Sequence, residues 1–296
     1  METSDNIIVL RGLLSELLPE KDALSAEIAP IGGMSNCNYL ISFPDSSFVL
    51  RVPGKGSEGM IFRDNERYNS IIAYQLGLCP EVRLLDPDTG IKITDYIKDS
   101  ESLSADTIQD SENRGKVASV LRHLHYSSKQ LKNEFNIFGE IDHYQSLLDK
   151  THAVMYPGWE GFKSKVMDIK TRLDRIGVSI VPCHNDPVPE NFLKNHNGSV
   201  FLIDWEYSGM NDPVADIAAL FLESNFSSDN RYLFLTEYYS EDSIPLWINE
   251  KILSYQILWD CLWAQWTVIK ESNGYDFGRY GRDRFERAVY NLTQLS

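Results

Sequence analysis

Hydrophobic and polar positions divide the chain into a strand-rich first third and a helix-rich remainder. Apolar residues at helical intervals predict a helix over residues 7–18. Short apolar runs bounded by turn residues predict strands at 38–43, 48–52, 82–85 and 91–97. The first two strands flank Pro44-Asp45-Ser46-Ser47 and therefore form a hairpin, and helix-forming residues ending at Gly77 predict a helix over 63–76.

From residue 99 onward, the pattern is mainly helical. Residues 100–112 are polar and acidic, and helical periodicity then covers 113–126, 142–156, 162–177, 213–223, 231–239, 246–271 and 282–295. We place a domain boundary near Asp99, which gives an N-terminal lobe of residues 1–98 and a C-terminal lobe of residues 99–296. The order of elements predicts an α+β fold with an antiparallel-sheet lobe and a larger, mainly helical lobe.

Composition narrows the possible partners. The net charge of −15, from 43 Asp and Glu against 28 Lys and Arg, argues against nucleic acid and against anionic lipid as partners. An apolar stretch of about 18 residues, which a membrane span requires, is absent from the sequence, so no stable membrane insertion is expected. The four cysteines form no Cys-x-x-Cys pair and the histidines show no zinc spacing, so a reducing, cytoplasmic setting without zinc is expected. The oligomeric state is left open.

A candidate catalytic segment begins with Asp186. Asn191 follows it in a short loop, and Asp204 lies where the buried strand predicted from the apolar run of residues 200–203 would end. Phosphoryl transfer needs a carboxylate near the acceptor hydroxyl and oxygen ligands for Mg²⁺. We therefore predict that Asp186 orients the acceptor, and that Asn191 and Asp204 bind the metal. Each residue alone would be an ordinary turn former, so the prediction depends on their combined spacing.

The same segment resembles the catalytic loop and metal-binding motif of the aminoglycoside phosphotransferase-like superfamily. Residues 203–213, Ile-Asp-Trp-Glu-Tyr-Ser-Gly-Met-Asn-Asp-Pro, are similar to the version found in the choline/ethanolamine kinase family, especially its bacterial LicA-type members. The resemblance extends from Gly32 to Ala288 and departs mildly at Pro187. It implies a protein-kinase-like two-lobed fold with ATP and Mg²⁺ as cofactors. It also implies that His184 and Asp216 brace the loop, while the role of Glu206 stays open.

The loop before the first predicted hairpin is a candidate for covering the phosphates of ATP. Gly32 and Gly33 precede Ser35 and Asn36, and glycines with small polar residues let backbone N–H groups approach phosphate. An ordinary turn explains two glycines about equally well. The resemblance to the choline kinase loop favours nucleotide binding by Ser35 and Asn36.

Arg51 and Glu66 are candidates for the cation that holds phosphate and for the helix carboxylate that holds this cation. A guanidinium fork can bridge phosphate and carboxylate, and the resemblance places arginine where protein kinases use lysine. The alternative is a surface charge on a strand and a solvated charge on a helix. The resemblance also places adenine against the backbone of Asp95 and Ile97.

Two tryptophans mark a candidate acceptor site. Trp263 and Trp266 are three positions apart and share one face of the predicted helix, where core packing would be the usual explanation. Residues 262–268 and 276–281 resemble the choline-binding region of the family. The resemblance implies that these indoles, with Tyr207 and Tyr280, surround a quaternary ammonium, and that Glu223 places a carboxylate beside it.

The predicted function is a choline kinase that phosphorylates the hydroxyl group of choline to give phosphocholine and ADP. An ethanolamine kinase is the nearest alternative, although a primary ammonium would benefit more from hydrogen-bond acceptors than from indoles. An aminoglycoside-type phosphotransferase would need a wider, more acidic groove. A binding module without turnover is disfavoured because Asp186, Asn191 and Asp204 are all present.

Overall fold

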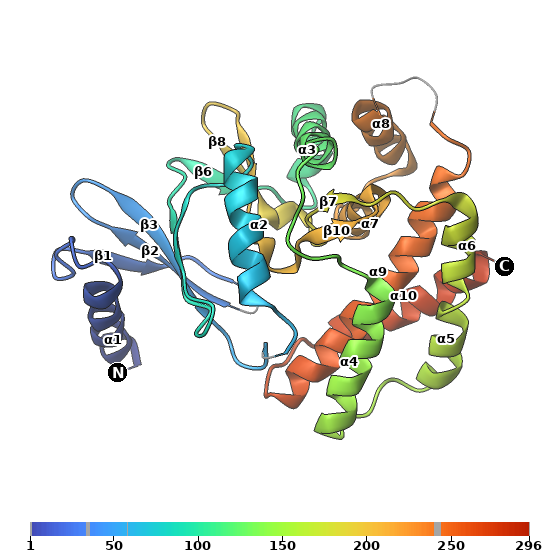
Figure 1. Cartoon of the computed structure of the whole chain (residues 1–296), viewed down its shortest axis with the longest axis horizontal. Helices are drawn as coiled ribbons and strands as arrows, with labels where there is room; N and C mark the ends of the chain where they lie inside the picture. Colours follow the sequence, from blue (N-terminus) through green and yellow to red (C-terminus); the bar gives the residue numbers. More distant parts are fainter. Residues whose placement is uncertain (1, 34–35, 58, 240–243, 296) are drawn as a thin grey trace. The chain divides into compact units, whose positions relative to one another are not determined.

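A computed structural model of the chain describes residues 2–33, 36–57, 59–239 and 244–295 (Figure 1). The chain divides into two compact units, one of Met1–Lys55 with Pro80–Lys98 and one of Gly56–Cys79 with Asp99–Ser296. One junction lies at the predicted boundary after residue 98, whereas residues 56–79 group with the second unit through their contacts. That the two parts divide nucleotide and choline binding between them stays a prediction.

The first unit is a five-stranded antiparallel sheet with one helix (Figure 1). Its elements are α1 (Glu2–Leu17), β1 (Glu27–Pro30), β2 (Asn36–Ser42), β3 (Ser47–Pro53), β4 (Val82–Leu85) and β5 (Lys92–Asp95), with the strand order β1-β2-β3-β5-β4. The predicted hairpin is confirmed, because Ser42 pairs with Ser47 and the N–H of Phe43 donates to the carbonyl oxygen of Ser46 at 2.8 Å. The sequence did not predict β1, a short strand that ends on a proline.

Helix α1 packs on the sheet of the first unit through leucines spaced four residues apart. Leu10 and Leu14 of the helix, and Leu18 directly after its end, are buried in one cluster with Ile41 and Leu50 of the sheet. This spacing places the leucines on one helical face, which explains why the periodicity of residues 7–18 predicted the element correctly.

The second unit contains α2 and all elements after residue 98. They are α2 (Arg63–Gln75), β6 (Ser100–Ser102), η1 (Thr107–Gln109), α3 (Ser111–His125), α4 (Ile137–Thr151), α5 (Trp159–Val166), α6 (Ile169–Ile176), β7 (Val181–Cys183), η2 (Pro189–Asn191), β8 (Phe192–Asn195), β9 (Val200–Leu202), η3 (Trp205–Tyr207), β10 (Gly209–Asn211), α7 (Pro213–Glu223), α8 (Ser228–Tyr239), α9 (Ile248–Ser272) and α10 (Tyr280–Gln294). The single helix predicted over 162–177 is wrong, because α5 and α6 are separate helices. Strand β9 confirms the buried strand that the apolar run of residues 200–203 predicted, and it pairs with β8 across a short turn. Strands β6 and β7 were not predicted, and each pairs with a strand distant in sequence, β6 with β8 and β7 with β10.

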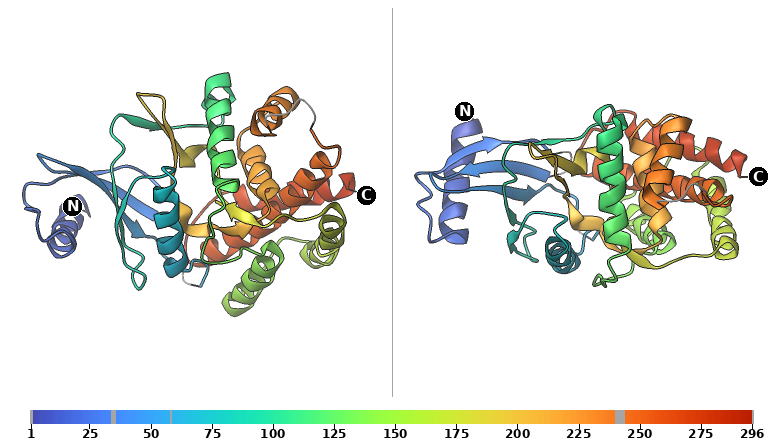
Figure 2. Two further views of the ribbon diagram at one scale, coloured as in Figure 1. Left: turned by 45° about the horizontal axis from the view of Figure 1, so that its top comes forward. Right: turned by 90° about the horizontal axis from the view of Figure 1, so that it is seen from above.

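Helix α9 forms the centre of the second unit. Its side chains are buried around most of its circumference, which is typical of a helix covered on all sides. Helices α4, α7 and α10 pack against it, as Figures 1 and 2 show. The indole N–H of Trp259 donates to the carbonyl oxygen of Ala215 at 2.9 Å, and the side-chain amide of Gln265 donates to that of Ile141 at 3.0 Å. These bonds fix α9 against α7 and α4.

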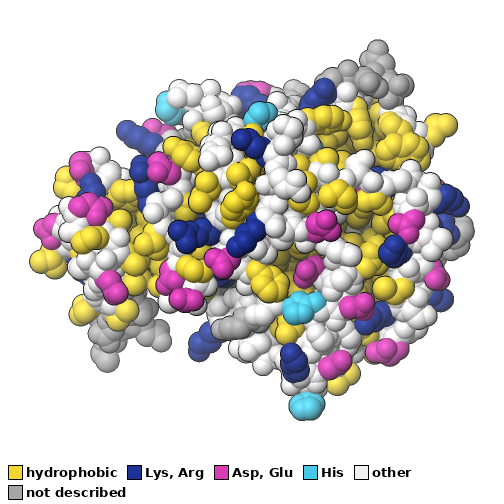
Figure 3. All heavy atoms as spheres, in the orientation of Figure 1, with side chains coloured by type: hydrophobic (Ala, Val, Ile, Leu, Met, Phe, Trp, Pro, Cys, Tyr) yellow, Lys and Arg dark blue, Asp and Glu magenta, His cyan; other side chains and the backbone are white. Residues whose placement is uncertain are grey.

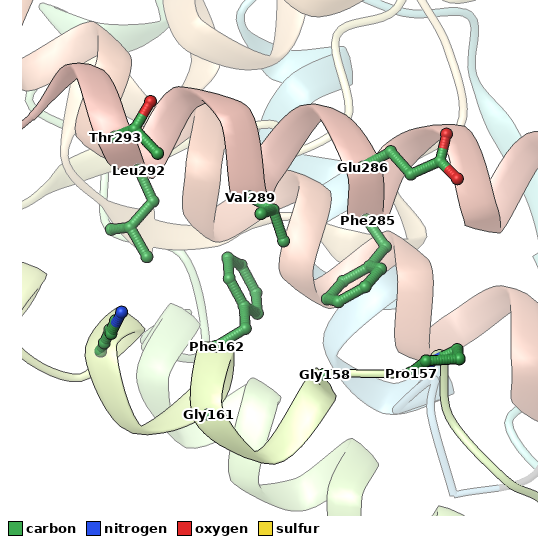
Figure 4. Close-up of a pocket in the computed structure, with 10 residues that line it drawn as sticks. Pro157, Gly158, Gly161, Phe162, Phe285, Glu286, Val289, Leu292 and Thr293 are labelled. Atoms are coloured by element: carbon green, nitrogen blue, oxygen red, sulfur yellow. The ribbon is translucent and has the colours of Figure 1, made fainter.

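Helix α10 has two buried faces of different character. Phe285 points toward α5, where its ring meets that of Phe162 edge to face with centroids 5.3 Å apart (Figure 4). A largely apolar groove of about 590 Å³ lies between these two helices. None of the predicted catalytic or choline-binding residues lines this groove, so it is separate from the candidate site. Arg284, next along the helix, is buried against α7 and α9 instead.

Within the described ranges, no helix has both the length and the apolar content that crossing a bilayer requires. On the face drawn in Figure 3, acidic and basic side chains are interspersed with apolar ones. The charged side chains on this face are therefore ordinary solvated surface rather than one acidic patch.

Candidate active site

The loop between β7 and β8 contains Asp186 and Asn191, and Asp204 follows β9 in the same unit. The side-chain amide of Asn191 donates to the main-chain carbonyl oxygen of Asp186 at 2.9 Å. The main-chain carbonyl of Asn191 accepts a hydrogen bond of 2.9 Å from the N–H of Ile203, the residue before Asp204. The loop and the end of β9 are thus tied together, as the spacing of these residues predicted.

Two residues at this site have backbone dihedrals that non-glycine residues seldom adopt. Asn185 has φ 67° and Asp204 has φ 65°, both in the left-handed region. Such conformations cost roughly 1 kcal/mol or more each and persist only where other contacts hold them. Asn185 is held on both sides, since its side chain donates to the Tyr207 carbonyl at 2.9 Å and accepts from the Asn211 amide at 2.9 Å.

A buried carboxylate on α7 braces the loop, in the way the resemblance implied for Asp216. Its two oxygens accept hydrogen bonds from the backbone N–H groups of His184, at 2.8 Å, and Asn185, at 2.7 Å. His125 adds a contact of 3.0 Å to the same carboxylate, and its other ring nitrogen lies 2.7 Å from the hydroxyl of Tyr238. No pattern in the sequence indicated that Asp216, His125 and Tyr238 would be connected.

Cys183 lies beside this network. Its sulfur, a nitrogen of His125 and an oxygen of Asp216 are all within 4.8 Å of one another. Both oxygens of Asp216 already accept backbone N–H groups, and Nε2 of His125 lies against one of them. We therefore interpret the cluster as a hydrogen-bond network that supports the loop.

His184 is a neutral structural residue of the loop. Its Nε2 lies 2.8 Å from the carbonyl oxygen of Ile203, and its Nδ1 accepts from the N–H of Asp186 at 3.3 Å. The ring meets Trp205 edge to face, with centroids 4.9 Å apart. Burial lowers the pKa of this histidine below its ordinary value, so the imidazole keeps a single proton on Nε2.

Asp186 is half-buried and lies in a strongly negative environment. Burial raises the pKa of its carboxyl well above the ordinary value, and the charges of Asp204, Glu223 and Glu206 raise it further. Arg284 acts in the opposite direction and lowers it. A half-buried carboxylate among other carboxylates is well suited to accept a proton, and the group as a whole attracts cations.

The oxygen atoms of Asn191 and Asp204 form a donor set that suits Mg²⁺. Magnesium binds oxygen ligands and usually takes only one or two carboxylates from a protein, with the rest from phosphate and water. The amide nitrogen of Asn191 donates to the carbonyl oxygen of Asp186, so the amide oxygen is the atom that could bind a metal ion. The neighbouring carboxylates supply the negative charge that a divalent cation would balance.

Arg63, which the sequence analysis did not single out, joins two buried carboxylates. Its guanidinium lies 2.8 Å from Glu66 and 3.0 Å from Glu206, and all three side chains are nearly inaccessible to solvent. The bridge connects α2 to the residue two positions after Asp204. It gives Glu206 a structural partner, which the motif alone could not supply.

The proposed pairing of Arg51 with Glu66 spans the two units and stays a prediction. Within the first unit, Arg51 is buried on β3 and donates to the carbonyl oxygen of Gly90 at 3.3 Å. Within the second unit, Glu66 accepts from Arg63. Both residues are held in place, as a phosphate-binding cation and its partner would need to be.

The other predicted nucleotide-binding residues belong to the first unit. Ser35 lies outside the described residues, and Asn36 begins β2 in a buried position. Gly33 has φ 138°, and a Cβ there would clash with the carbonyl oxygen of Asn36, so the turn requires glycine. The carboxylate of Asp95 pairs with Arg83 at 2.7 Å, and Ile97 follows β5. Nucleotide binding by these residues stays a prediction.

Three of the four predicted aromatic residues of the acceptor site, Tyr207, Trp263 and Trp266, form a continuous cluster. The rings of Tyr207 and Trp263 have centroids 5.0 Å apart, and those of Trp263 and Trp266 are 6.2 Å apart at 88°. Trp259 stacks on Trp263 at 6.0 Å. All are largely buried, so these side chains fill core positions. Tyr207 connects the cluster to the loop that contains Asp186, because its main-chain carbonyl accepts from the side chain of Asn185.

Tyr144 on α4 extends this cluster and was missed from the sequence. Its hydroxyl is hydrogen-bonded to that of Tyr207, and burial, together with the charges of Glu140, Glu206 and Asp186, raises its pKa well above the ordinary value. A single tyrosine in an amphipathic helix resembles any other core residue, so no sequence signal distinguishes it.

Glu223 and Tyr280, the remaining predicted choline-binding residues, meet at Arg284. The Arg284 guanidinium forms an ion pair with Glu223 and donates to the Tyr280 hydroxyl at 2.6 Å. The resemblance placed the carboxylate of Glu223 beside the ammonium group, and the sequence did not indicate Arg284 as its partner. The only local signal was its position four residues after Tyr280, on the same face of the helix.

Comparison with known proteins points to one family. The sequence model of the family "Choline/ethanolamine kinase" matches residues 28–289. Protein LicA of Haemophilus influenzae is 33% identical over 279 residues, which are 92% of this chain and 81% of that protein. The crystal structure of the choline kinase LicA from Streptococcus pneumoniae is 39% identical, covers 98% of this chain and 100% of that chain, and has a TM-score of 0.88. A LicA structure in complex with AMP is 38% identical, covers 97% and 98%, and has a TM-score of 0.84.

Proposed function

The chain belongs to the choline/ethanolamine kinase family, and we propose that it transfers the γ-phosphoryl group of ATP to the hydroxyl group of choline, giving phosphocholine and ADP. Similarity to a solved choline kinase over nearly the whole chain supports a kinase acting on choline. The observation that carries the proposal is the pairing, in one unit, of the Asp186–Asn191–Asp204 arrangement with the aromatic cluster around Trp263.

In this proposal, Asp186 orients the choline hydroxyl and accepts its proton as the phosphoryl group is transferred. Burial and the carboxylates around it raise its pKa, which favours proton acceptance. The hydrogen bond from Asn191 and the Asp216 brace on the adjacent residues hold the loop in one conformation. Preorganisation of this kind supplies much of the rate in phosphoryl transfer, where positioning and charge matter more than covalent chemistry.

The amide oxygen of Asn191 and the carboxylate of Asp204 would hold Mg²⁺. When bound, Mg²⁺ neutralises charge on the phosphates of ATP. The left-handed backbone of Asp204 fixes where its carboxylate departs from the end of β9.

We propose that residues of the first unit bind the nucleotide, with Glu66 of α2 as the partner of Arg51. The AMP complex of the similar LicA protein supports an adenine nucleotide. Ser35 and Asn36 would contact phosphate, Arg51 would offset its charge, and the backbone near Asp95 and Ile97 would contact adenine.

Choline recognition is proposed to rest on aromatic faces. Trimethylammonium has no N–H group to donate, and each cation–π contact contributes about 0.5–2 kcal/mol. Trp263 and Trp266, with Tyr207 and Tyr280, would provide these faces, and Glu223 would add negative charge. The same pocket would admit ethanolamine, which remains the second candidate because the family includes kinases of either amino alcohol.

We also propose that the enzyme works in the cytoplasm. The four cysteines are free thiols, of which Cys79, Cys183 and Cys261 are buried. Free thiols in these positions support a reducing compartment, where ATP is also available.

The experiment that tests the function is ADP release with MgATP and, in parallel, choline, ethanolamine or kanamycin. Asp186→Ala serves as the blank. Choline-dependent turnover that disappears in the variant would establish the proposal. A preference for ethanolamine would show that ethanolamine is the substrate and would leave the proposed mechanism unchanged. Inactivity with all three acceptors would overturn the proposal.

A further inference from the structure

Arg284 contacts two residues proposed to bind choline and a third, fully buried carboxylate. Its guanidinium forms ion pairs with Glu223 at the end of α7 and with Asp260 of α9, the latter at 3.1 Å. It also donates to the Tyr280 hydroxyl at 2.6 Å, and its central carbon lies 4.7 Å from the centroid of the Tyr280 ring. One buried side chain thus joins three helices at the proposed acceptor site.

The charges around Arg284 balance in pairs. Arg287 binds Asp260 through two hydrogen bonds of 2.7 Å each, in the bidentate geometry that suits arginine and carboxylate. The negative charge of Asp260 is therefore balanced by Arg287. Arg284 contacts both Asp260 and Glu223 and balances the charge of Glu223. Two guanidinium groups face two carboxylates, and the charge of Glu223 is already partnered within the protein.

We propose that Arg284 is a specificity-determining positioning residue that makes the acceptor site select a quaternary over a primary ammonium. The inference rests on the proposed function and deepens it. Arg284 acts through Glu223, whose carboxylate it occupies, and through Tyr280, whose hydroxyl and ring it fixes.

The selection follows from the different needs of the two ammonium groups. A primary ammonium donates three N–H bonds, and burying it costs free energy unless acceptors replace its water. A carboxylate held by arginine is a weakened acceptor for a second cation. A trimethylammonium group needs no acceptor and is satisfied by aromatic faces, so fixing Tyr280 and occupying Glu223 penalises ethanolamine more than choline.

The test compares kcat/KM for choline with kcat/KM for ethanolamine, at saturating MgATP, in the wild type and Arg284→Met. Methionine fills similar volume without charge or donors. Removing the ion pair frees Glu223 as an acceptor, and we expect the choline-to-ethanolamine ratio to fall about tenfold or more, the scale of one charged hydrogen bond. Arg284 also influences Asp186, but a change in proton acceptance affects both substrates and cancels in the ratio.

Two further variants make the result specific. Arg287→Met disturbs the same buried Asp260 without touching Glu223 or Tyr280, so it should leave the ratio unchanged. Arg284→Lys keeps the positive charge but replaces the planar guanidinium by a compact ammonium. Its choline-to-ethanolamine ratio should therefore lie between those of Arg284→Met and the wild type. If Arg284→Met does not fold, Arg284→Lys takes its place as the test variant. The choline-to-ethanolamine ratio of Arg284→Lys should lie several-fold below that of the wild type.

An unchanged ratio in a folded Arg284 variant, or an equal fall in Arg287→Met, would overturn the inference. Wild-type protein that phosphorylates neither amino alcohol would instead refute the proposed function. Calorimetry without nucleotide would then measure the binding of choline and ethanolamine to the wild type and to the Arg284 variant. A preference for choline that is the same in both proteins would overturn the inference.

Discussion

The side-chain amide of Asn191 donates a 2.9 Å hydrogen bond to the main-chain carbonyl oxygen of Asp186. The proposed metal ligand therefore also holds the residue proposed to accept the proton of the acceptor. The amide nitrogen of Asn191 holds the backbone of Asp186, and its amide oxygen is the proposed ligand of Mg²⁺.

This division predicts the outcome of Asn191→Asp. Aspartate keeps an oxygen ligand for Mg²⁺ but cannot donate to the Asp186 carbonyl when ionised, and it adds charge to an already negative site. We expect kcat to fall about 10- to 100-fold, since a lost buried hydrogen bond costs about 1–3 kcal/mol. Steady-state kinetics over a Mg²⁺ titration would measure kcat in the variant. A kcat equal to that of the wild type would show that the hydrogen bond between Asn191 and Asp186 does not contribute to the reaction.

Asp204 should be indispensable for metal binding and dispensable for folding. Asp204→Asn keeps the size of the side chain but weakens the affinity for a divalent cation, and asparagine tolerates the left-handed backbone observed here. We expect choline-dependent ADP release to be lost while the melting temperature stays close to that of the wild type. Excess Mg²⁺ should recover part of the rate. Full activity at low Mg²⁺ would remove Asp204 from the metal site.

Asp216→Ala should damage the loop without touching a substrate. The change leaves the buried N–H groups of His184 and Asn185 without their acceptor, and also removes the partner of His125. We expect the free energy of unfolding to fall by about 2–5 kcal/mol. Denaturant unfolding would show this, with Asp174→Ala, an exposed aspartate on α6, as the control. Equal stability of both variants would contradict the bracing role.

The sequence predicted those parts of the site that depend on local spacing. Asp186 and Asn191 share one loop, and Asp204 ends an apolar run, so their proximity follows from a few neighbouring residues. The start of α7 was predicted correctly because Pro213 occupies its first turn and the Asp212 side chain accepts the N–H of Val214 at 2.9 Å.

Partners chosen across long sequence separations could not be predicted. Arg63 meets Glu206 and Arg284 meets Glu223 only because the helices pack as they do, and any of the chain's acidic residues could have been the partner. The break between α5 and α6 at Met167 and Asp168 was missed for a related reason. Apolar periodicity continues across it, so the pattern resembles one helix although the backbone forms two.

Arg51→Ala should weaken nucleotide binding and leave choline binding unaffected. Loss of a buried guanidinium that offsets phosphate charge should raise the KM for ATP about tenfold or more. Steady-state kinetics with each substrate varied in turn would separate the two constants. Lys21→Ala, which removes a surface ion pair with Asp45 in the same unit, is the control and should change neither KM. An unchanged KM for ATP in Arg51→Ala would remove this residue from the nucleotide site.

His184 should make the stability of the protein sensitive to mild acid. Its folded-state pKa is lowered by burial, whereas the unfolded chain takes up a proton near its ordinary value of about 6.5. Below that pH the unfolded state binds more protons than the folded state, so the free energy of unfolding should fall as the pH drops from about 7.5 to about 5.5. Above that pH, the histidine is neutral in both states and its contribution to the free energy of unfolding is constant.

His184→Asn should flatten the dependence of the free energy of unfolding on pH, whereas His152→Asn, at an exposed histidine, should not. The raised pKa of Asp186 opposes the trend in all three proteins, so the comparison isolates the histidine. Denaturant unfolding at several pH values measures the slopes, and equal slopes in the wild type and His184→Asn would show that the imidazole is not held neutral by the fold.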